Sequence, residues 1–272
     1  MDYLKLYEEE HIKNRLSYSQ IREKYNISRG TWDYWIRQKL GKSADQRKHV
    51  CNDDFFDIID SEIKAYLLGF LYADGYISSD GRIGILLNEK DVEILELIKQ
   101  FIAPTSIIQH INYQNIKRNP QVKIRFKSKR LYKRLQELGF TTDKTHTDCN
   151  ILSKIPTSFK KDFIRGYTDG DGCIRFDKQG TWYKLGITWC NGVPGILKEI
   201  QEYFKQCRGH LHHINNYYTL SFEKKSDVLT ICKNLYEGCT YYLKRKYINA
   251  INSINYCNNT ELKHKTKELC SV

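Results

Sequence analysis

The sequence predicts an α+β fold that contains the same half-domain twice, preceded by a small helical module. The first indication is a repeated segment, because residues 67–75 read LLGFLYADG and residues 164–172 read IRGYTDGDG. Each copy is a helix with small residues that runs into an Asp-Gly step, and the final aspartates, Asp74 and Asp171, are 97 residues apart. A repeat of about one hundred residues is too long for a solenoid unit and suits a duplicated α+β half-domain.

The second indication is that similar elements follow each copy. Residues 88–95 (NEKDVEIL) align with residues 190–197 (CNGVPGIL) at an offset of 102. Hydrophobic spacing predicts the order helix, strands, helix, strands, helix in both copies. The predicted strands are 82–87, 122–127, 181–189 and 218–222, and the predicted helices are 91–102, 131–138, 195–205 and 226–236.

The third indication is a helical pattern within the first 40 residues. Ser17 followed by Gln20 is a capping-box sequence that predicts a helix over Tyr18–Lys24. Ser28 can cap a second helix, which carries Trp32, Trp35 and Ile36 on one face. With an upstream helix over residues 3–16, this segment resembles a three-helix unit with a helix-turn-helix.

In that arrangement the second capped helix is the recognition helix. Arg29, Thr31 and Arg37 lie at or near its exposed side and are candidates for DNA contact. The alternative is a small bundle that binds another protein. Residues 41–53 are polar and basic, as expected of a linker that follows a phosphate backbone.

The charge balance favours a polyanionic partner. Lys and Arg outnumber Asp and Glu by 44 to 32, and the pI is about 9.1. Clustered basic residues gain affinity for nucleic acid through counterion release. The alternative is a basic surface that serves solubility alone.

The cysteines and the N-terminal sequence bear on the compartment. The nine cysteines include no Cys-x-x-Cys pair, which argues against a zinc ribbon or a disulfide framework. No basic-then-apolar leader and no apolar run of membrane-spanning length is present. We therefore expect an intracellular protein of the cytoplasm, the nucleoid or an organelle, with no membrane partner.

The clearest predicted strand, 122–127, has a basic face. Its period of two places Lys123, Arg125 and Lys127 on one side and three apolar residues on the other. A sheet with one face packed on helices and one basic face in solvent suits a DNA duplex. Arg82 and Lys184, on predicted strands of the two halves, complete the strand residues expected to contact DNA.

The repeated helices carry small residues four positions apart, Gly69 with Ala73 and Gly166 with Gly170. Such stripes let two helices pack closely, which would bring Asp74 and Asp171 together at the helix C-termini. Two adjacent carboxylates repel each other unless a divalent cation lies between them, and oxygen ligands favour Mg²⁺ or Ca²⁺. For a single copy, an ordinary Asp-Gly turn would be the better explanation, but the duplication favours a metal site.

Both segments resemble the signature of the LAGLIDADG homing endonucleases in its single-chain, two-motif form, and the resemblance covers about residues 55–255. It implies two αββαββα halves related by a pseudo-two-fold axis, whose twin sheets bind double-stranded DNA. The expected domains are a helix-turn-helix-like module with linker (1–50), a first half (51–155) and a second half with a C-terminal tail (156–272). The expected oligomeric state is a monomer that acts through internal pseudo-symmetry.

The resemblance also implies site residues. Asp74 and Asp171 match the final acids of the signature, which bind Mg²⁺ and each serve cleavage of one strand. Mn²⁺ is expected to substitute for Mg²⁺. The basic residue near the end of each half matches Lys144 and Lys246, with a phosphate contact as the alternative role for each. A polar residue after the first hairpin matches Asn88 in one half but Cys190 in the other, so the halves are expected to cut unequally. Tyr72 replaces the earlier acid of the signature, which the second copy retains as Asp169.

These features lead to two hypotheses. The first is a site-specific, divalent-metal-dependent endonuclease that hydrolyses one phosphodiester on each DNA strand. The second is a non-cleaving relative, either a transcription regulator or an intron RNA maturase. Retention of both final aspartates favours the nuclease. The genetic origin stays open among a free-standing gene, an intron and another mobile element.

Overall fold

The computed structural model describes residues 2–40, 50–112, 119–142 and 150–269, without the side chains of 37, 39, 40 and 260–269. Contacts between residues divide the chain into two compact units. Unit 1 contains Met1–Phe55 and Ser78–Tyr132, and unit 2 contains Phe56–Ile77 and Lys133–Val272. Both repeated segments therefore belong to unit 2.

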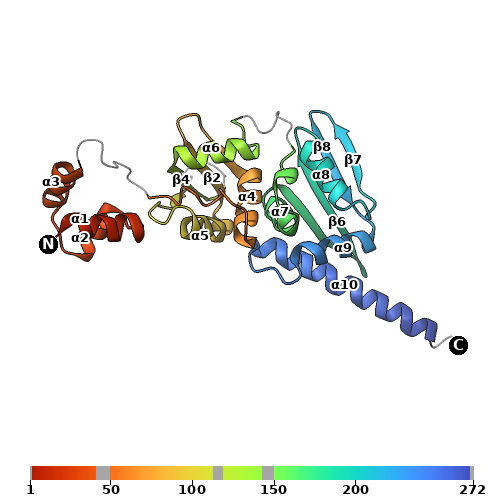
Figure 1. The fold of residues 1–272 in the computed structure, drawn as a ribbon. Coiled ribbons are helices and arrows are strands. Elements are labelled where there is room, and N and C mark those ends of the chain that lie inside the picture. Colours follow the sequence, from red (N-terminus) through yellow and green to blue (C-terminus); the bar gives the residue numbers. More distant parts are fainter. Residues whose placement is uncertain (1, 41–49, 113–118, 143–149, 270–272) are drawn as a thin grey trace. The chain divides into compact units, whose positions relative to one another are not determined.

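Four helical elements form the N-terminal module of unit 1 (Figure 1): α1 (Tyr3–Leu6), the π-helix η1 (Tyr7–Lys13), α2 (Tyr18–Lys24) and α3 (Arg29–Leu40). The capping box of Ser17 and Gln20 is confirmed, and the Thr31 amide donates to Ser28 Oγ over 3.1 Å. The helix predicted over residues 3–16 is instead a short α-helix followed by a π-helix that ends at Lys13. The module has its own core of Leu6, Tyr7, Ile21, Trp32 and Ile36.

The first sheet has the strand order β1-β2-β4-β3. Its elements run along the chain as β1 (Gly75–Ile77), β2 (Arg82–Asn88), η2 (Glu89–Asp91), α5 (Val92–Phe101), β3 (Gln109–Ile111), β4 (Gln121–Lys127) and α6 (Lys129–Leu138). Helix α5 packs on β2 and β4 through its apolar side, which includes Ile94, Leu95 and Ile98. Gly139 ends α6 with a φ of 109°, as its predicted C-cap role requires.

The second sheet has the matching order β5-β6-β8-β7. The remaining elements are α4 (Glu62–Asp74), η3 (Leu152–Lys154), η4 (Thr157–Phe159), α7 (Lys160–Asp171), β5 (Gly172–Gln179), β6 (Trp182–Asn191), α8 (Gly195–Tyr203), β7 (His210–Ile214), β8 (Tyr217–Phe222), α9 (Lys225–Tyr236) and α10 (Lys244–Leu269). Helix α8 packs on β6 and β8, and α9 contacts β6, α7 and α10.

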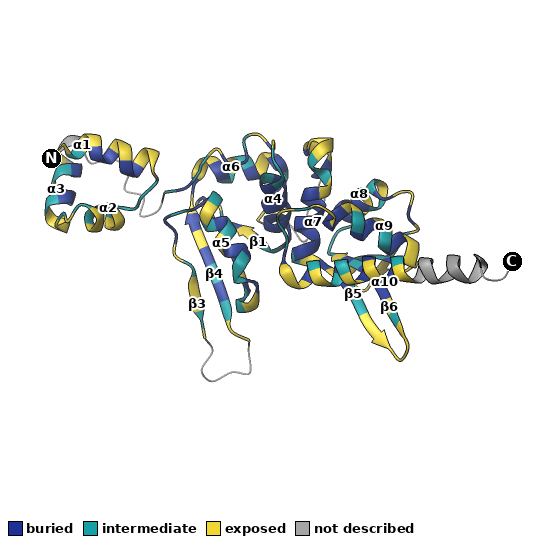
Figure 2. Cartoon of the chain, turned by 90° about the horizontal axis from the view of Figure 1, so that it is seen from below, coloured by how far each residue is buried: buried dark blue, intermediate teal, exposed yellow. Residues whose placement is uncertain are grey.

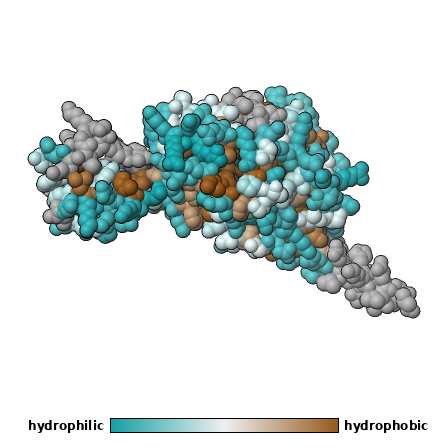
Figure 3. All heavy atoms as spheres, viewed as in Figure 1, coloured by the Kyte–Doolittle hydropathy of each residue, from teal (hydrophilic) through white to brown (hydrophobic). Residues whose placement is uncertain are grey.

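Burial follows the predicted pattern. Strand β4 alternates between buried Val122, Ile124 and Phe126 and the more exposed basic residues, and α4 and α7 are buried along most of their length (Figure 2). In the view of Figure 3 the surface is mainly hydrophilic, with hydrophobic residues in small patches. Among the described residues, no helix combines the length and apolarity needed to cross a membrane.

Candidate active site

The repeated helices α4 and α7 pack against each other through their glycines. A side chain at Gly69 would collide with the backbone carbonyl of Phe163 on α7. Reciprocally, a side chain at Gly166 would collide with the backbone carbonyl of Tyr66 on α4. Each glycine therefore faces the opposite backbone with no intervening side chain, as the small-residue stripes predict.

This packing joins the C-terminal ends of the two helices. Asp74 is the last residue of α4 and Asp171 is the last residue of α7. A Cβ atom at Gly170, the neighbour of Asp171, would lie 3.2 Å from Oδ2 of Asp74 and would collide with the Ala73 side chain. The Asp74 carboxylate thus lies beside the end of α7, where both carboxylates face the negative ends of helix dipoles.

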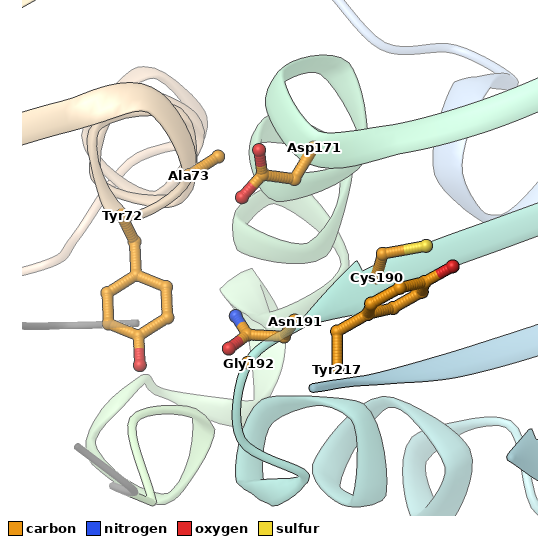
Figure 4. A pocket seen from close by; sticks show the side chains of 7 residues that line it. All are labelled: Tyr72, Ala73, Asp171, Cys190, Asn191, Gly192 and Tyr217. Carbon is orange, nitrogen blue, oxygen red and sulfur yellow. The ribbon is translucent and has the colours of Figure 1, made fainter. Parts of the chain in front are cut away.

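A cavity of about 320 Å³ opens beside Asp171. Its lining comes from the end of α4 (Tyr72, Ala73), from Asp171, and from residues around the ends of β6 and β8 (Cys190, Asn191, Gly192, Tyr217). Figure 4 shows the Asp171 carboxylate and the Asn191 amide pointing into the space next to Ala73. Burial raises the pKa of both Tyr167 and Cys190, and the negative charge of Asp171 also raises both.

Asn191 lines the cavity beside Asp171, and the sequence alignment did not single it out. Asn88 ends β2, and its Oδ1 accepts from the Lys90 amide, two residues later, over 3.1 Å. Asn191 ends β6, and its Oδ1 accepts from the Val193 amide, also two residues later, over 3.1 Å. The structural counterpart of Asn88 is therefore Asn191 and not Cys190, because the equivalence is shifted by one residue from the sequence alignment. The sequence signal that could have identified Asn191 is the asparagine that ends the corresponding strand in each half.

Lys246 lies in the first turn of α10 and is 6% exposed. Its ammonium group donates to the carbonyl of Thr168 over 3.1 Å and to the carbonyl of Gly172. These two carbonyls lie on either side of Asp171 in the sequence. Burial lowers the pKa of Lys246, the Arg245 charge lowers it further, and the carboxylates of Asp169 and Asp74 oppose this shift.

Asp169, the earlier acid of the second copy, has a structural position at the helix junction. Its buried carboxylate accepts from the Tyr236 hydroxyl (2.7 Å), the Leu243 amide (2.7 Å) and the Tyr66 hydroxyl (2.9 Å). Burial raises its pKa to about 6. The carboxylate thus connects α4, α9 and the segment before α10 to the last turn of α7. Tyr72, at the corresponding position of the first copy, is an apolar neighbour of Tyr167, Phe163 and Phe140.

Arg165 forms a second buried connection in unit 2 and was also missed by sequence analysis. Its guanidinium group binds Asp162 (2.8 Å) and Glu62 (2.7 Å) and donates to the carbonyls of Leu235 and Tyr241. Because it is 1% exposed, its charge depends on these partners. Together Arg165 and Asp169 bind the end of α9 and residues 241–243, the segment that leads into α10 and Lys246.

The predicted basic face of β4 forms as expected. Lys123 is half-buried, Arg125 and Lys127 are exposed, and all three alternate with buried apolar residues. Arg82 lies opposite Lys127 on β2, and Asp80 pairs with both, at 2.8 Å from Arg82 and 3.5 Å from Lys127. Lys184 is exposed on β6, where it pairs with Asp177 of β5 in the sheet register.

The remaining predicted residues lie in three different settings. Arg29 is exposed and pairs with Asp33 at 3.6 Å, whereas the Thr31 hydroxyl lies 2.7 Å from Ser28 Oγ at the start of α3. The backbone of Arg37 belongs to α3, but its side chain lies outside the described structure. Lys144 also lies outside the described residues.

The donor set at the helix ends suits a hard cation. Within the described ranges, no group of three or more His, Cys, Asp and Glu side chains is placed to hold a metal ion. The candidate site therefore offers two carboxylates, Asp74 and Asp171, whose oxygens are of the kind that Mg²⁺ or Ca²⁺ favours. The absence of a Cβ at Gly170 leaves the space in which the Asp74 carboxylate approaches this site.

No protein-family model matches the sequence. Among curated proteins, an uncharacterized protein of Methanocaldococcus jannaschii, MJ0398, is 23% identical over 256 residues, which cover 86% of each chain. This similarity extends well beyond the repeated segments.

Solved structures give a more specific result. The LAGLIDADG meganucleases I-AabMI and I-CpaMI, each bound to uncleaved DNA, match with TM-scores of 0.52 and identities of 18% and 13%. The LAGLIDADG homing endonuclease I-GzeII, in complex with its DNA target, matches with a TM-score of 0.51 and 13% identity. The matches cover 74–76% of this chain and 93–95% of those chains. Two similar four-stranded sheets, preceded by N-terminal helices, thus give this chain the fold of the LAGLIDADG homing endonucleases.

Proposed function

We propose that this protein is a site-specific, divalent-metal-dependent endonuclease that hydrolyses one phosphodiester on each strand of double-stranded DNA. The observation that carries the proposal is the junction of α4 and α7, where Gly170 accommodates the Asp74 carboxylate beside Asp171. Two acids at paired helix ends are costly for stability unless they serve a cation. Similarity to DNA-bound LAGLIDADG proteins supports DNA as the substrate.

Asp74 and Asp171 would hold the cation, for which we propose Mg²⁺, with Mn²⁺ as a substitute. When bound, a divalent cation supplies charge stabilisation at the scissile phosphodiester and activation of water. The Asn191 amide, which lines the Asp171 cavity, would orient water or a phosphate oxygen in the second half, and Asn88 would do so in the first. For Lys246 we propose that its two carbonyl contacts fix the end of α7.

The DNA-binding surface would combine the basic strand residues of both halves with the N-terminal module. Lys123, Arg125, Lys127 and Arg82 would contact the backbone from the first sheet, and Lys184 from the second. We propose the boundaries 1–50, 51–155 and 156–272 for the module and the two halves, and a monomer as the active form. The capped helices α2 and α3 support a helix-turn-helix-like role for the module, and we place Arg29, Thr31 and Arg37 at the DNA.

The decisive experiment is selection of cleaved duplexes from a random-sequence library with Mg²⁺, alongside a chelator control. On a selected duplex, Asp74→Asn and Asp171→Asn should each give nicking of one strand, and the double variant should bind without cleavage. Asp60→Asn is the matched control. Asp60 lies just before α4, at the opposite end of this helix from Asp74, and pairs with Lys64 at 2.8 Å. Enrichment of bound duplexes without any cleaved product would instead identify a non-cleaving regulator. Full double-strand cleavage by a single variant would contradict the role of that aspartate.

A further inference from the structure

We propose that Arg15 is a positioning residue that fixes the N-terminal module on the first half, so that both read DNA at one set spacing. The inference rests on the proposed DNA binding of both parts. It concerns unit 1 alone, which contains the module, β2 to β4 and α5. Residues 41–49, which join the two parts in the sequence, are polar and basic.

The backbone conformation of Arg15 follows from the way the π-helix η1 ends. The Asn14 amide donates to Glu9 and the Leu16 amide to Glu10, over 2.9 and 2.8 Å, so the helix closes with wide turns. Arg15 then adopts a φ of 56°, in the left-handed region that non-glycine residues rarely occupy. A strained backbone of this kind persists only where other contacts over-determine it.

Those contacts are made by the Arg15 guanidinium group. Nη1 donates to the Cys51 carbonyl over 2.7 Å, and Nη2 donates to Oδ1 of Asn52 over 3.0 Å. The acceptors lie 36 and 37 positions later in the sequence, on the far side of the linker. A bidentate, planar donor sets orientation as well as distance, which a single flexible contact does not.

The acceptor segment is itself fixed to the first half. The Asn52 amide donates to the Ile102 carbonyl at the end of α5 over 2.7 Å. The Val50 amide donates to Oγ1 of Thr105 over 2.7 Å, and the buried Cys51 lies against the carbonyl of Lys127 at the end of β4. Arg15 is thus connected, through one short segment, to the strand whose basic face we assign to DNA.

The junction has complementary charges. A cavity of about 190 Å³ is bounded by the end of η1 and by the first half, with Arg15 and Arg130 near Asp53 and Asp54. Opposite charges around one junction favour a single docked arrangement over a freely tethered module.

A docked module makes a specific prediction about DNA. B-DNA turns once in about 10.5 base pairs, so an insertion of about 5 base pairs moves the outer contacts to the opposite side of the duplex. A docked module cannot follow that displacement, whereas a flexibly tethered module can.

The probes are duplexes selected by binding of the full chain from a random-sequence library in Ca²⁺, each remade with insertions of 0–10 base pairs between the core and the outer protected segment. For the unmodified protein, an insertion of 5 base pairs should lower affinity about tenfold, as loss of a module's phosphate contacts does. For Arg15→Ala, affinity for the uninterrupted duplex should fall similarly, and the insertions should have little further effect. Arg22→Ala is the matched control, because the guanidinium bonds that it makes within the described residues go to Tyr18 and Ser19 of its own helix, and it should retain the spacing dependence.

A flat response of the unmodified protein to insertions, or an unchanged spacing dependence in Arg15→Ala, would overturn the proposal. Small-angle scattering of the DNA-free full chain gives a second readout, since Arg15→Ala should increase the radius of gyration and Arg22→Ala should not. Equal profiles for Arg15→Ala and the unmodified protein would also contradict it. Both measurements are independent of cleavage, so failure of the nuclease assignment leaves them interpretable.

Discussion

Gly170 lies directly against the Asp74 carboxylate, so that a methyl group at this glycine would come within 3.2 Å of Oδ2 of Asp74. The absence of a side chain at Gly170 of α7 therefore leaves room for the final acid of α4. Because Asp171 follows Gly170, both acids lie at the ends of two helices that are in contact. The geometry of the candidate site therefore depends on how α4 and α7 pack, and substitutions can affect this packing and the chemistry separately.

Gly166→Ala should destabilise the protein by about 2–3 kcal/mol, because its methyl group would overlap the Tyr66 carbonyl and force the backbones apart. Gly30→Ala is the control, since no atom of the described residues lies within 4 Å of its added Cβ on α3, and it should change stability by less than about 1 kcal/mol. Urea unfolding monitored by circular dichroism measures both. Equal midpoints for the two variants would show that the close approach of the helices is wrong.

Gly170→Ala should lower the cleavage rate at least tenfold while DNA affinity in Ca²⁺ changes little. The added methyl group displaces Ala73 and the Asp74 carboxylate, but the basic strand faces are unaffected. Gly186→Ala on β6 is the comparison, because its Cβ would meet only ordinary contacts at 3.7 Å and beyond. Single-turnover cleavage and filter binding on a selected duplex provide the two measurements. A Gly170→Ala variant that cleaves at the unmodified rate would separate Asp74 from the chemistry.

Lys246→Met should cost about 1–3 kcal/mol of stability, because two buried carbonyls lose their charged donor. The cleavage rate should fall with it, since those carbonyls flank Asp171. Lys244→Met, at an exposed position in the same turn, should leave the unfolding midpoint nearly unchanged. Thermal unfolding and single-turnover cleavage test this prediction, and a fully stable Lys246→Met variant without activity would instead assign the lysine a direct chemical role.

The N-terminal module should lose stability in acid through Glu10. Hydrogen bonds from Lys24, Tyr25 and Asn14 hold the pKa of this carboxyl at about 2, below its ordinary value of 4.5. The folded pKa is the lower one, so the stabilisation is complete above pH 4.5 and is lost as the pH falls toward 2.

Glu10→Gln should remove this dependence, and the exposed Glu8→Gln should retain it. Hydrogen exchange of residues 17–36 at pH 7 and at pH 3 measures the module separately from the two halves. Parallel loss of protection in Glu10→Gln and the unmodified protein between these pH values would contradict the assignment.

Local sequence patterns predicted most of the elements, because their causes lie within a few residues. The Ser17 capping box, the alternation of β4 and the glycine that ends α6 are all confirmed. The π-helix was not predicted, since the apolar spacing of residues 3–16 does not distinguish it from an α-helix. The one-residue shift from Cys190 to Asn191 was missed because insertions between the copies leave the alignment undetermined at that point.

The sequence by itself determined that two small-residue helices, each ending in an aspartate, would recur in a duplicated α+β chain. Periodicity, caps and the duplication are written in neighbouring residues, so they need no knowledge of distant contacts. Only the tertiary structure decided that Lys246 donates to the carbonyls around Asp171, that Asp169 accepts three hydrogen bonds, and that Arg15 reaches Cys51. The partner of a long polar side chain depends on which distant backbone is brought beside it, and burial makes that pairing obligatory.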